Sequence, residues 1–146
     1  PAPPMRRATA AAVAMPAFCE TFNQKAAQSA YDAGEAVLFA CGIGSPFVTT
    51  DTGAALRAAE MGCDGLFKGT MVDGIYTADP KLDPTATRYE RLTYAEAIGR
   101  ELKVMDIAAM ALARENGIPI IVFSIHAPGG FVEILKGGGR GTVVSG

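Results

Sequence analysis

Apolar and polar positions divide the chain into two alternating kinds of segment. Short apolar runs bounded by glycine, such as AVLFA and IPIIVF, are typical of strands that are buried on both faces of a sheet. Longer segments carry apolar residues at helical spacing between a capping side chain and a glycine. We expect helices near residues 21–33, 49–61, 93–99, 105–116 and 130–135, and strands near 36–40, 65–68, 118–123 and 142–144.

This alternation of strands and helices predicts the fold class. It indicates an α/β domain with a mainly parallel sheet that has helices on both faces. Residues 1–14 are rich in proline and alanine and are expected to be loosely ordered, whereas residues 15–146 are expected to form the folded part.

Composition and charge exclude several classes of protein. The 146 residues include 13 basic and 15 acidic side chains, which give a net charge of −2 and argue against a nucleic-acid partner. No apolar run approaches the roughly 20 residues of a membrane span. The sequence has three widely separated cysteines and one histidine, which argues against a structural metal site and against a disulfide framework. This use of cysteine fits a protein of the reducing cytoplasm best.

The segment CGIGSPFVTTD, residues 41–51, is the first candidate binding loop. It joins an expected strand to the start of an expected helix through two glycines and several hydroxyl side chains. Backbone N–H groups at a helix N-terminus favour an anion such as a phosphate. The alternative is a tight turn with capping threonines, and the residues alone do not decide between the two.

The segment KGTMVDGIYTADP, residues 68–80, is the second candidate loop and leaves the carboxyl end of another expected strand. Asp73 could orient a lysine or a metal-bound nucleotide, Tyr76 could stack on a base, and Asp79 could accept hydrogen bonds from a ribose or base. The alternative is that the Asp-Gly and Asp-Pro pairs only make turns.

Four further residues have plainer interpretations. Asp106 is expected to be the N-cap of the longest helix. His126 is interpreted as a turn residue, because no second ligand lies near it in the sequence. Cys41 and Cys63 are expected to fill apolar space.

The chain resembles the bacterial uridylate kinases (UMP kinases), which belong to the amino acid kinase superfamily. The resemblance extends from about residue 15 to the C-terminus. It depends on the ordered blocks CGIGSPFVTTDTGAALRAAEMG, FKGTMVDGIYTADPKLDPTATRYERLTYAEA, ELKVMDIAAMALARENGIPIIVF and the closing APGG…GT.

The resemblance implies transfer of the γ-phosphoryl group of ATP to UMP, with Mg²⁺ arriving on the nucleotide phosphates and no metal site of the protein's own. It implies a cytoplasmic homo-oligomer, a hexamer in the family. Asp73 and Asp106 match the aspartates that organise the catalytic centre, and Thr70, Tyr76 and Asp79 match contacts to ATP. The implied UMP-binding residues are Ile43, Gly44, Ser45, Pro46, Phe47, Val48, Thr49 and Thr50.

The chain departs from the family pattern at three places. Ile43 and Ser45 replace a threonine and an asparagine, and Met71 stands where a lysine is common. The lysine- and glycine-rich segment that grips ATP at the start of family members has no counterpart, so the chain resembles the C-terminal, nucleotide-binding part of the enzyme. We expect strands without neighbours, which favour self-association, and a poor or inactive kinase.

Two alternatives remain open. The first is a non-catalytic nucleotide-binding or assembly module derived from a UMP kinase, which the missing phosphate-gripping lysine favours. The second is a related kinase that acts on an acidic metabolite, which the TTDT and YTADP blocks disfavour.

Overall fold

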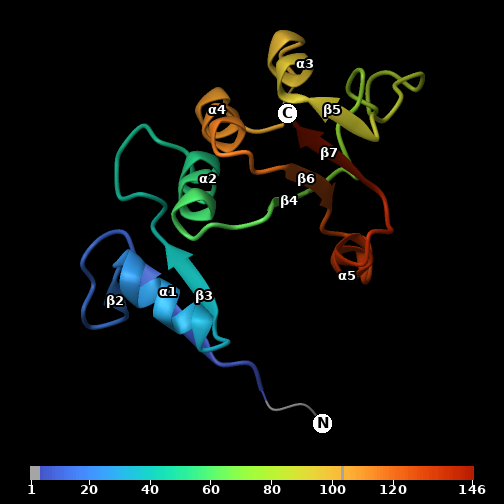
Figure 1. Cartoon of the computed structure of the whole chain (residues 1–146). Helices are drawn as coiled ribbons and strands as arrows, with labels where there is room; N and C mark the ends of the chain where they lie inside the picture. The colour runs from blue at the N-terminus through green and yellow to red at the C-terminus, as the bar shows by residue number, and fades with distance from the viewer. Residues whose placement is uncertain (1–3, 103) are drawn as a thin grey trace.

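The computed structural model describes residues 4–102 and 104–146 of the chain (Figure 1). The helices are α1 (Gln24–Asp32), α2 (Thr50–Glu60), α3 (Tyr94–Gly99), α4 (Ile107–Glu115) and α5 (Gly130–Leu135). The strands are β1 (Arg7–Ala11), β2 (Glu20–Thr21), β3 (Ala36–Ala40), β4 (Leu66–Thr70), β5 (Arg91–Thr93), β6 (Ile120–Ser124) and β7 (Gly141–Ser145).

The strands form two sheets. One has the order β2-β1-β3, and both of its pairings are parallel. The other has the order β4-β6-β7-β5, in which β4 pairs with β6 and β5 with β7 in parallel, while β6 and β7 are antiparallel. The predicted α/β class with mainly parallel pairing is therefore confirmed.

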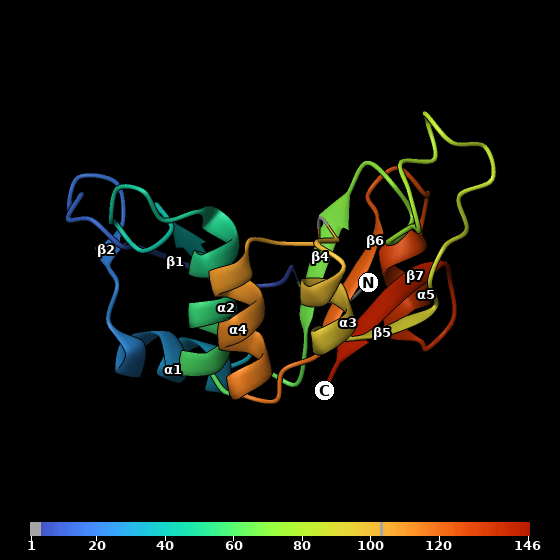
Figure 2. The same ribbon diagram turned by 90° about the horizontal axis from the view of Figure 1, so that it is seen from above.

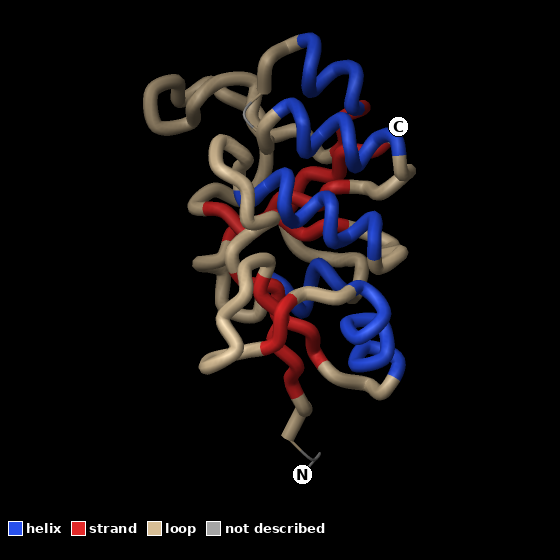
Figure 3. The backbone as a smooth tube through the Cα atoms, turned by 90° about the vertical axis from the view of Figure 1, so that its left-hand side faces the viewer, coloured by secondary structure: helices blue, strands red, loops and turns tan. Residues whose placement is uncertain are grey.

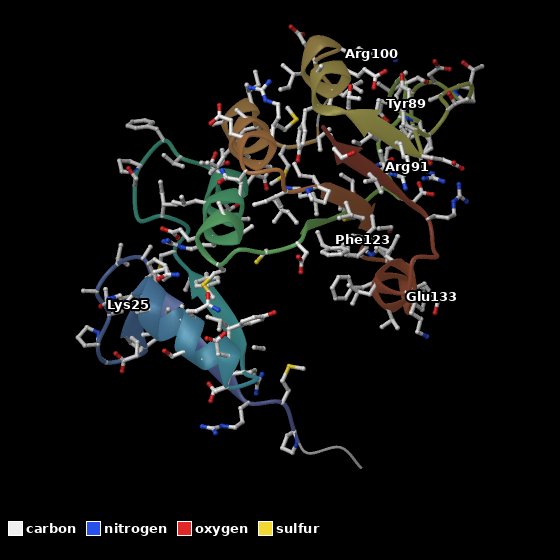
Figure 4. The ribbon with its side chains drawn as sticks, viewed as in Figure 1. Lys25, Tyr89, Arg91, Arg100, Phe123 and Glu133 are labelled. Atoms are coloured by element: carbon white, nitrogen blue, oxygen red, sulfur yellow. The ribbon has the colours of Figure 1, made fainter. Side chains whose placement is uncertain are left out.

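Helices cover both faces of the four-stranded sheet, as predicted. On one face, Ile120, Val122 and Val144 belong to the hydrophobic core together with buried residues of α3 and α4. On the other face, the ring of Phe123 stacks on Phe131 of α5 with 5.5 Å between their centroids. Figure 4 shows Phe123 beside α5, which also carries Glu133.

Helices α2 and α4 connect the two sheets. They pack against each other along their length, and Figure 2 shows the strands of the two sheets on either side of this pair. Most of their buried residues are small, with Ala55 and Ala58 in α2 and Ala109 and Ala113 in α4, beside the larger Met110 of α4. In Figure 3 these helices stack beside one another along one side of the strands.

Three strands lie where the sequence pattern predicts none. Residues 1–14 were expected to be loosely ordered, but residues 7–11 form β1, which pairs with β2 and β3. Residues 1–3 lie outside the described part of the chain. β2 and β5 are so short that pairing with neighbours, rather than local propensity, determines them.

The cysteine interpretation is wrong for two residues. Cys41 and Cys63 are exposed instead of filling apolar space. Cys41 follows the end of β3 and Cys63 precedes β4, and both line a cavity between these strands. Burial of part of its surface, followed by the nearby carboxylate of Asp64, raises the pKa of the Cys63 thiol.

Within the described ranges, none of the helices has the length and apolar character that crossing a membrane requires.

Candidate functional site

The loop after β3 lies at the carboxyl edge of the three-stranded sheet. A Cβ on Gly44 would lie 3.1 Å from the carbonyl oxygen of Ala12, so the loop packs closely against the end of β1. Gly44 has a φ of 72°, and Phe47 has a φ of 64° with its side chain exposed to solvent. Uncommon backbone conformations of this kind cluster at ligand sites.

The predicted UMP-binding residues thus form one accessible surface loop that ends at the start of α2. Residues 44–50 are exposed, and Thr49 is the N-cap of α2 through a hydrogen bond from the backbone N–H of Thr52. The first N–H groups of a helix have no partner within the helix and carry partial positive charge. This end of the loop therefore suits an anionic group.

Asp106 joins the starts of α2 and α4. Its carboxylate caps α4 by accepting from the backbone N–H of Ala109 at 2.9 Å. The same carboxylate accepts from the hydroxyl of Thr52 at 2.9 Å and from the hydroxyl of Thr49. The predicted N-cap is confirmed, and two helix N-termini meet at one carboxylate.

The protonation of Asp106 follows from these contacts. Burial raises the pKa of the carboxyl, but hydrogen bonds from Thr49, from the backbone of Ala109 and from Thr52 outweigh burial, and the pKa lies below its ordinary value. Asp106 is therefore ionised at neutral pH, and the two helix N-termini beside it also favour a negative charge.

Lys68 brings a positive charge to the same edge. It lies in β4, and its Nζ forms an ion pair with the carboxylate of Asp51 in the first turn of α2. Both side chains are partly buried. A charged residue in the otherwise apolar strand GLFKGT is the sequence signal for this contact.

The loop after β4 holds a second polar cluster. The hydroxyl of Tyr76 donates to Asp73 Oδ1 at 2.6 Å, and Arg140 Nε lies 3.0 Å from Asp73 Oδ2. The hydrogen bond from Tyr76 lowers the pKa of Asp73 most, burial opposes this, and Arg140 lowers it further. The same hydrogen bond, with burial, raises the pKa of Tyr76.

The loop that carries this cluster is fixed to β7. Thr142 is fully buried, and its hydroxyl accepts from the backbone N–H of Ile75 at 2.9 Å and donates to the carbonyl of Tyr89 at 2.5 Å. A Cβ on Gly74 would lie 2.6 Å from this hydroxyl, so only glycine fits there.

The structure brings two of the three predicted ATP-binding residues to one cavity. Tyr76 and Asp79 line a space of about 450 Å³. Thr70 lies outside this lining, at the end of β4, where its hydroxyl donates to the carbonyl of Val72 at 2.7 Å. Asp79 is exposed and caps the turn that follows by accepting from the N–H of Lys81.

The two predicted catalytic aspartates belong to different clusters. Asp106 lies with the loop after β3, and Asp73 with the loop after β4. Within the described residues no hydrogen bond or ion pair joins them directly. β4 connects the clusters. Its Lys68 forms the ion pair with α2, and its last residue, Thr70, precedes the loop that carries Asp73.

Sequence reasoning missed two contributors. Thr52 faces Asp106 from a position 54 residues away, and nothing local indicates that contact. Arg140 follows a run of three glycines, and its pairing with Asp73 depends on how β7 is placed. His126 lies in a turn as predicted, with Nε2 3.0 Å from the sulfur of Met71.

Comparison with known proteins identifies similar sequences and folds. A model described as the amino acid kinase family matches residues 7–124. The uridylate kinase of Agrobacterium fabrum is 65% identical over 133 residues, which are 91% of this chain and 55% of that protein. The uridylate kinase of Mesorhizobium japonicum is 63% identical over 134 residues, which are 92% of this chain and 56% of that protein.

Solved structures of similar fold agree with the sequence comparisons, because they include UMP kinases. A UMP kinase from Ureaplasma parvum has a TM-score of 0.94 at 34% identity and is matched over 97% of this chain and 61% of that chain. A UMP kinase from Bacillus anthracis has a TM-score of 0.93 at 34% identity, over 97% of this chain and 58% of that chain. The chain spans about half the length of the curated relatives it matches.

Proposed function

The chain belongs to the amino acid kinase family, and on this premise we propose that it carries the nucleotide sites of a uridylate kinase, which transfers the γ-phosphoryl group of ATP to UMP. The observation that carries the proposal is the meeting of two helix N-termini and Lys68 at one edge, with the cavity lined by Tyr76 and Asp79 in the loop that follows the strand of Lys68. The names of the relatives support the choice of substrates.

UMP is proposed to bind along residues 43–50. The N-terminus of α2 would face its phosphate, and the hydroxyls of Ser45 and Thr50 would donate to it. Ile43 supplies apolar contact where the family has a hydroxyl. Asp106 would hold Thr49 and Thr52 in position and fix α2 against α4.

ATP is proposed to bind over the loop after β4. Thr70, Tyr76 and Asp79 would contact the nucleotide, with the base in the cavity that Tyr76 and Asp79 line. Phosphoryl transfer requires positioning and neutralisation of charge more than covalent chemistry. Lys68 and Arg140 are basic side chains of the two clusters that are paired with carboxylates.

Magnesium is proposed to arrive with ATP. The described residues contain no group of three or more potential ligands, and Asp73 and Asp106 are single carboxylates in separate clusters. This donor set fits an ion that is held mainly by phosphates and water. Bound in this way, magnesium would supply neutralisation of the phosphate charge. Asp73 and Asp106 are the ionised groups suited to face it.

The setting of the reaction is proposed from the same premise. The UDP product would enter pyrimidine nucleotide biosynthesis, and the free cysteines fit the reducing cytoplasm. A homo-oligomer is proposed, as the resemblance implies. We expect turnover by this chain to be weak, because Lys68 and Arg140 are already paired with carboxylates and so offer less positive charge to the γ-phosphate.

The test measures ADP release from Mg·ATP with UMP, with CMP as the substrate control, together with nucleotide binding by calorimetry. We expect UMP to bind and to stimulate ADP release, and Asp106→Asn and Asp73→Asn to abolish the stimulation. Asp32→Asn, at the end of α1, should leave it unchanged. Binding without any turnover would favour the non-catalytic module, and turnover with aspartate, glutamate or carbamate in place of UMP would overturn the substrate.

A further inference from the structure

A cavity of about 440 Å³ lies on the face of the four-stranded sheet that carries α5. Phe67, Ile121 and Val143 form its apolar floor, because the register of β4, β6 and β7 places them side by side in one row across the sheet. Ile134 of α5 and the glycines that follow this helix form its wall. We call this space the α5 cavity. Among the described residues, none lines both the α5 cavity and the space proposed for the ATP base.

Two arginines form the polar side of the α5 cavity. Arg91 is the first residue of β5 and extends the row of the floor, since its partner in β7 is Val143 (Figure 4). Nη1 of Arg88 donates a hydrogen bond to the carbonyl of Gly141, which lies two residues before Val143 in β7. Two residues of a strand span roughly 7 Å. The two arginines therefore lie at neighbouring levels along one strand.

The guanidinium of Arg88 keeps donor capacity that the described residues do not use. Its Nε is buried and has no acceptor among them. Asp73 is near enough for Arg88 to lower the pKa of its carboxyl, but Tyr76 and Arg140 are the groups that contact this carboxylate. The hydrogen bond to Gly141 thus fixes Arg88 in place without neutralising its charge.

The charge of the α5 cavity is positive. Glu90 also lines the cavity, but among the ion pairs that the described residues form, none joins Glu90 to either arginine. Like charges repel each other more strongly beside an apolar surface, where water screens them less. An anion bound between the arginines would remove this repulsion.

The loop after α5 adds a backbone donor. Gly137 and Gly138 direct their N–H groups back to carbonyls of α5, whereas the N–H of Gly139 has no acceptor among the described residues. Gly139 has a φ of 77°, and a Cβ there would lie 3.3 Å from Ile134. A loop without side chains lets a ligand approach the backbone closely.

We propose that the α5 cavity is a binding site for a small organic phosphate. The phosphate would lie between Arg88 and Arg91 and accept a hydrogen bond from the N–H of Gly139. The apolar part of the molecule would lie on the floor that Phe67 begins. The site is separate from the proposed phosphoryl transfer and does not rest on it.

The donors favour a phosphate over a carboxylate. Two guanidinium groups and a backbone N–H offer more donors than the two oxygens of a carboxylate accept, and they match the three oxygens of a phosphate monoester. Its charge of nearly −2 also balances two arginines. The apolar floor adds affinity only for a phosphate that carries a hydrocarbon group or a ring.

The experiment titrates the 146-residue chain with phenyl phosphate, inorganic phosphate or phenol at constant ionic strength and follows NMR signals of single residues. We expect phenyl phosphate to shift the side-chain Nε–H signals of Arg88 and Arg91 and the amide of Gly139. Inorganic phosphate should shift the same signals with about tenfold weaker affinity, because it leaves the apolar floor uncovered. Phenol should shift none of them. Amides of Tyr76 and Asp79 report on the other cavity and should not move.

A substitution tests the charge. Arg91→Gln removes one guanidinium at an exposed position, where the fold does not depend on it. We expect the affinity for phenyl phosphate to fall about tenfold or more, as for the loss of a charged hydrogen bond. Arg114→Gln makes the same change at an exposed position of α4 and should leave the affinity unchanged.

Four results would overturn the proposal. The first is that phenyl phosphate shifts none of the three signals. The second is that it shifts the amides of Tyr76 and Asp79 instead, which would assign its binding to the other cavity. The third is an equal loss of affinity in Arg114→Gln, which would show attraction by overall charge. The fourth is inorganic phosphate that binds as tightly as phenyl phosphate, which would make the site one for the free ion.

Discussion

Asp73 shows how a single hydrogen bond sets the charge of a residue at the candidate ATP site. Its carboxylate lies partly exposed between the hydroxyl of Tyr76 and the guanidinium of Arg140. Both contacts favour the ionised form and hold the pKa below its ordinary value, with the Tyr76 hydroxyl contributing most. Removing that hydroxyl should therefore have a measurable electrostatic result.

We expect Tyr76→Phe to raise the pKa of Asp73 toward its ordinary value, as measured by NMR titration of the carboxyl carbon. A carboxyl whose pKa is lowered on folding stabilises the protein above its unfolded pKa of about 3.9, and that stabilisation is lost as the pH falls through the folded pKa. The variant should thus lose about 0.5–1.5 kcal/mol of stability at pH 7 and less at low pH.

Tyr31→Phe is the matched control, because Tyr31 is an exposed tyrosine on α1. It should leave both the Asp73 titration and the acid dependence unchanged. An Asp73 pKa that does not move in Tyr76→Phe would show that the nearby arginines and the backbone hydrogen bond, and not the Tyr76 hydroxyl, hold the carboxylate ionised.

Residue-level prediction from the sequence succeeds where the cause is local. Asp106 is an N-cap as predicted, and Thr93 begins α3 in a capping box with Glu96, a contact between residues three positions apart. The hydrogen bonds from Thr49 and Thr52 to Asp106 span more than 50 residues, and only the packing of α2 against α4 creates them. The sequence therefore indicates Asp106 as a cap but not as the link between two helices.

At the scale of elements, long segments follow the hydrophobic pattern and short strands do not. The expected helices and the four apolar strands are present, with ends shifted by a few residues. β1 has the sequence RATAA, which contains no aromatic or branched aliphatic residue, and it is a strand because it lies between β2 and β3. The local sequence of β1 therefore does not predict that it pairs with these two strands.

The link between β7 and the loop after β4 provides a prediction at this scale. The buried hydroxyl of Thr142 serves the N–H of Ile75 and the carbonyl of Tyr89 at once. Thr142→Val keeps the shape but leaves both groups without a partner, and we expect a loss of about 1–3 kcal/mol in the free energy of unfolding, measured by urea denaturation.

Thr142→Ser is the comparison, because it keeps the hydroxyl and removes only a methyl group, at a cost of about 0.5–1.5 kcal/mol. If the valine variant is less stable than the serine variant, the hydrogen bonds of the hydroxyl are the reason why threonine at this position stabilises the protein. Equal stability of the valine variant and the unaltered chain would mean that the loop is held by its packing alone.

The whole molecule consists of two sheets that are joined through helices. The hydrophobic core includes residues of α2 and of the four-stranded sheet, while β3 and β1 lie outside it. The α2–α4 contact therefore lies between the two sheets. Its close approach depends on small side chains, because Ala109 and Ala113 of α4 have no exposed surface.

Enlarging one of these alanines tests whether this contact holds the molecule together. Ala113→Leu places three additional carbons in a filled space, and we expect a loss of about 1–3 kcal/mol. Ala108→Leu makes the same change on an exposed position of α4 and should stay within about 0.5 kcal/mol. Urea denaturation gives the free energies, and amide exchange in β1 and β3 shows whether the smaller sheet loses order together with the larger one.

β1 and β3 belong to the three-stranded sheet, which lies outside the core that contains the substituted helix. If their amides exchange faster in Ala113→Leu than in the unaltered chain, α2 and α4 couple the two sheets. Unchanged exchange there, with the same loss of stability elsewhere, would mean that the sheets are ordered independently. The loop after β3 and the loop after β4 would then be aligned only by the contacts of Asp106 and Lys68, and the nucleotide sites would depend on those two residues for their relative position.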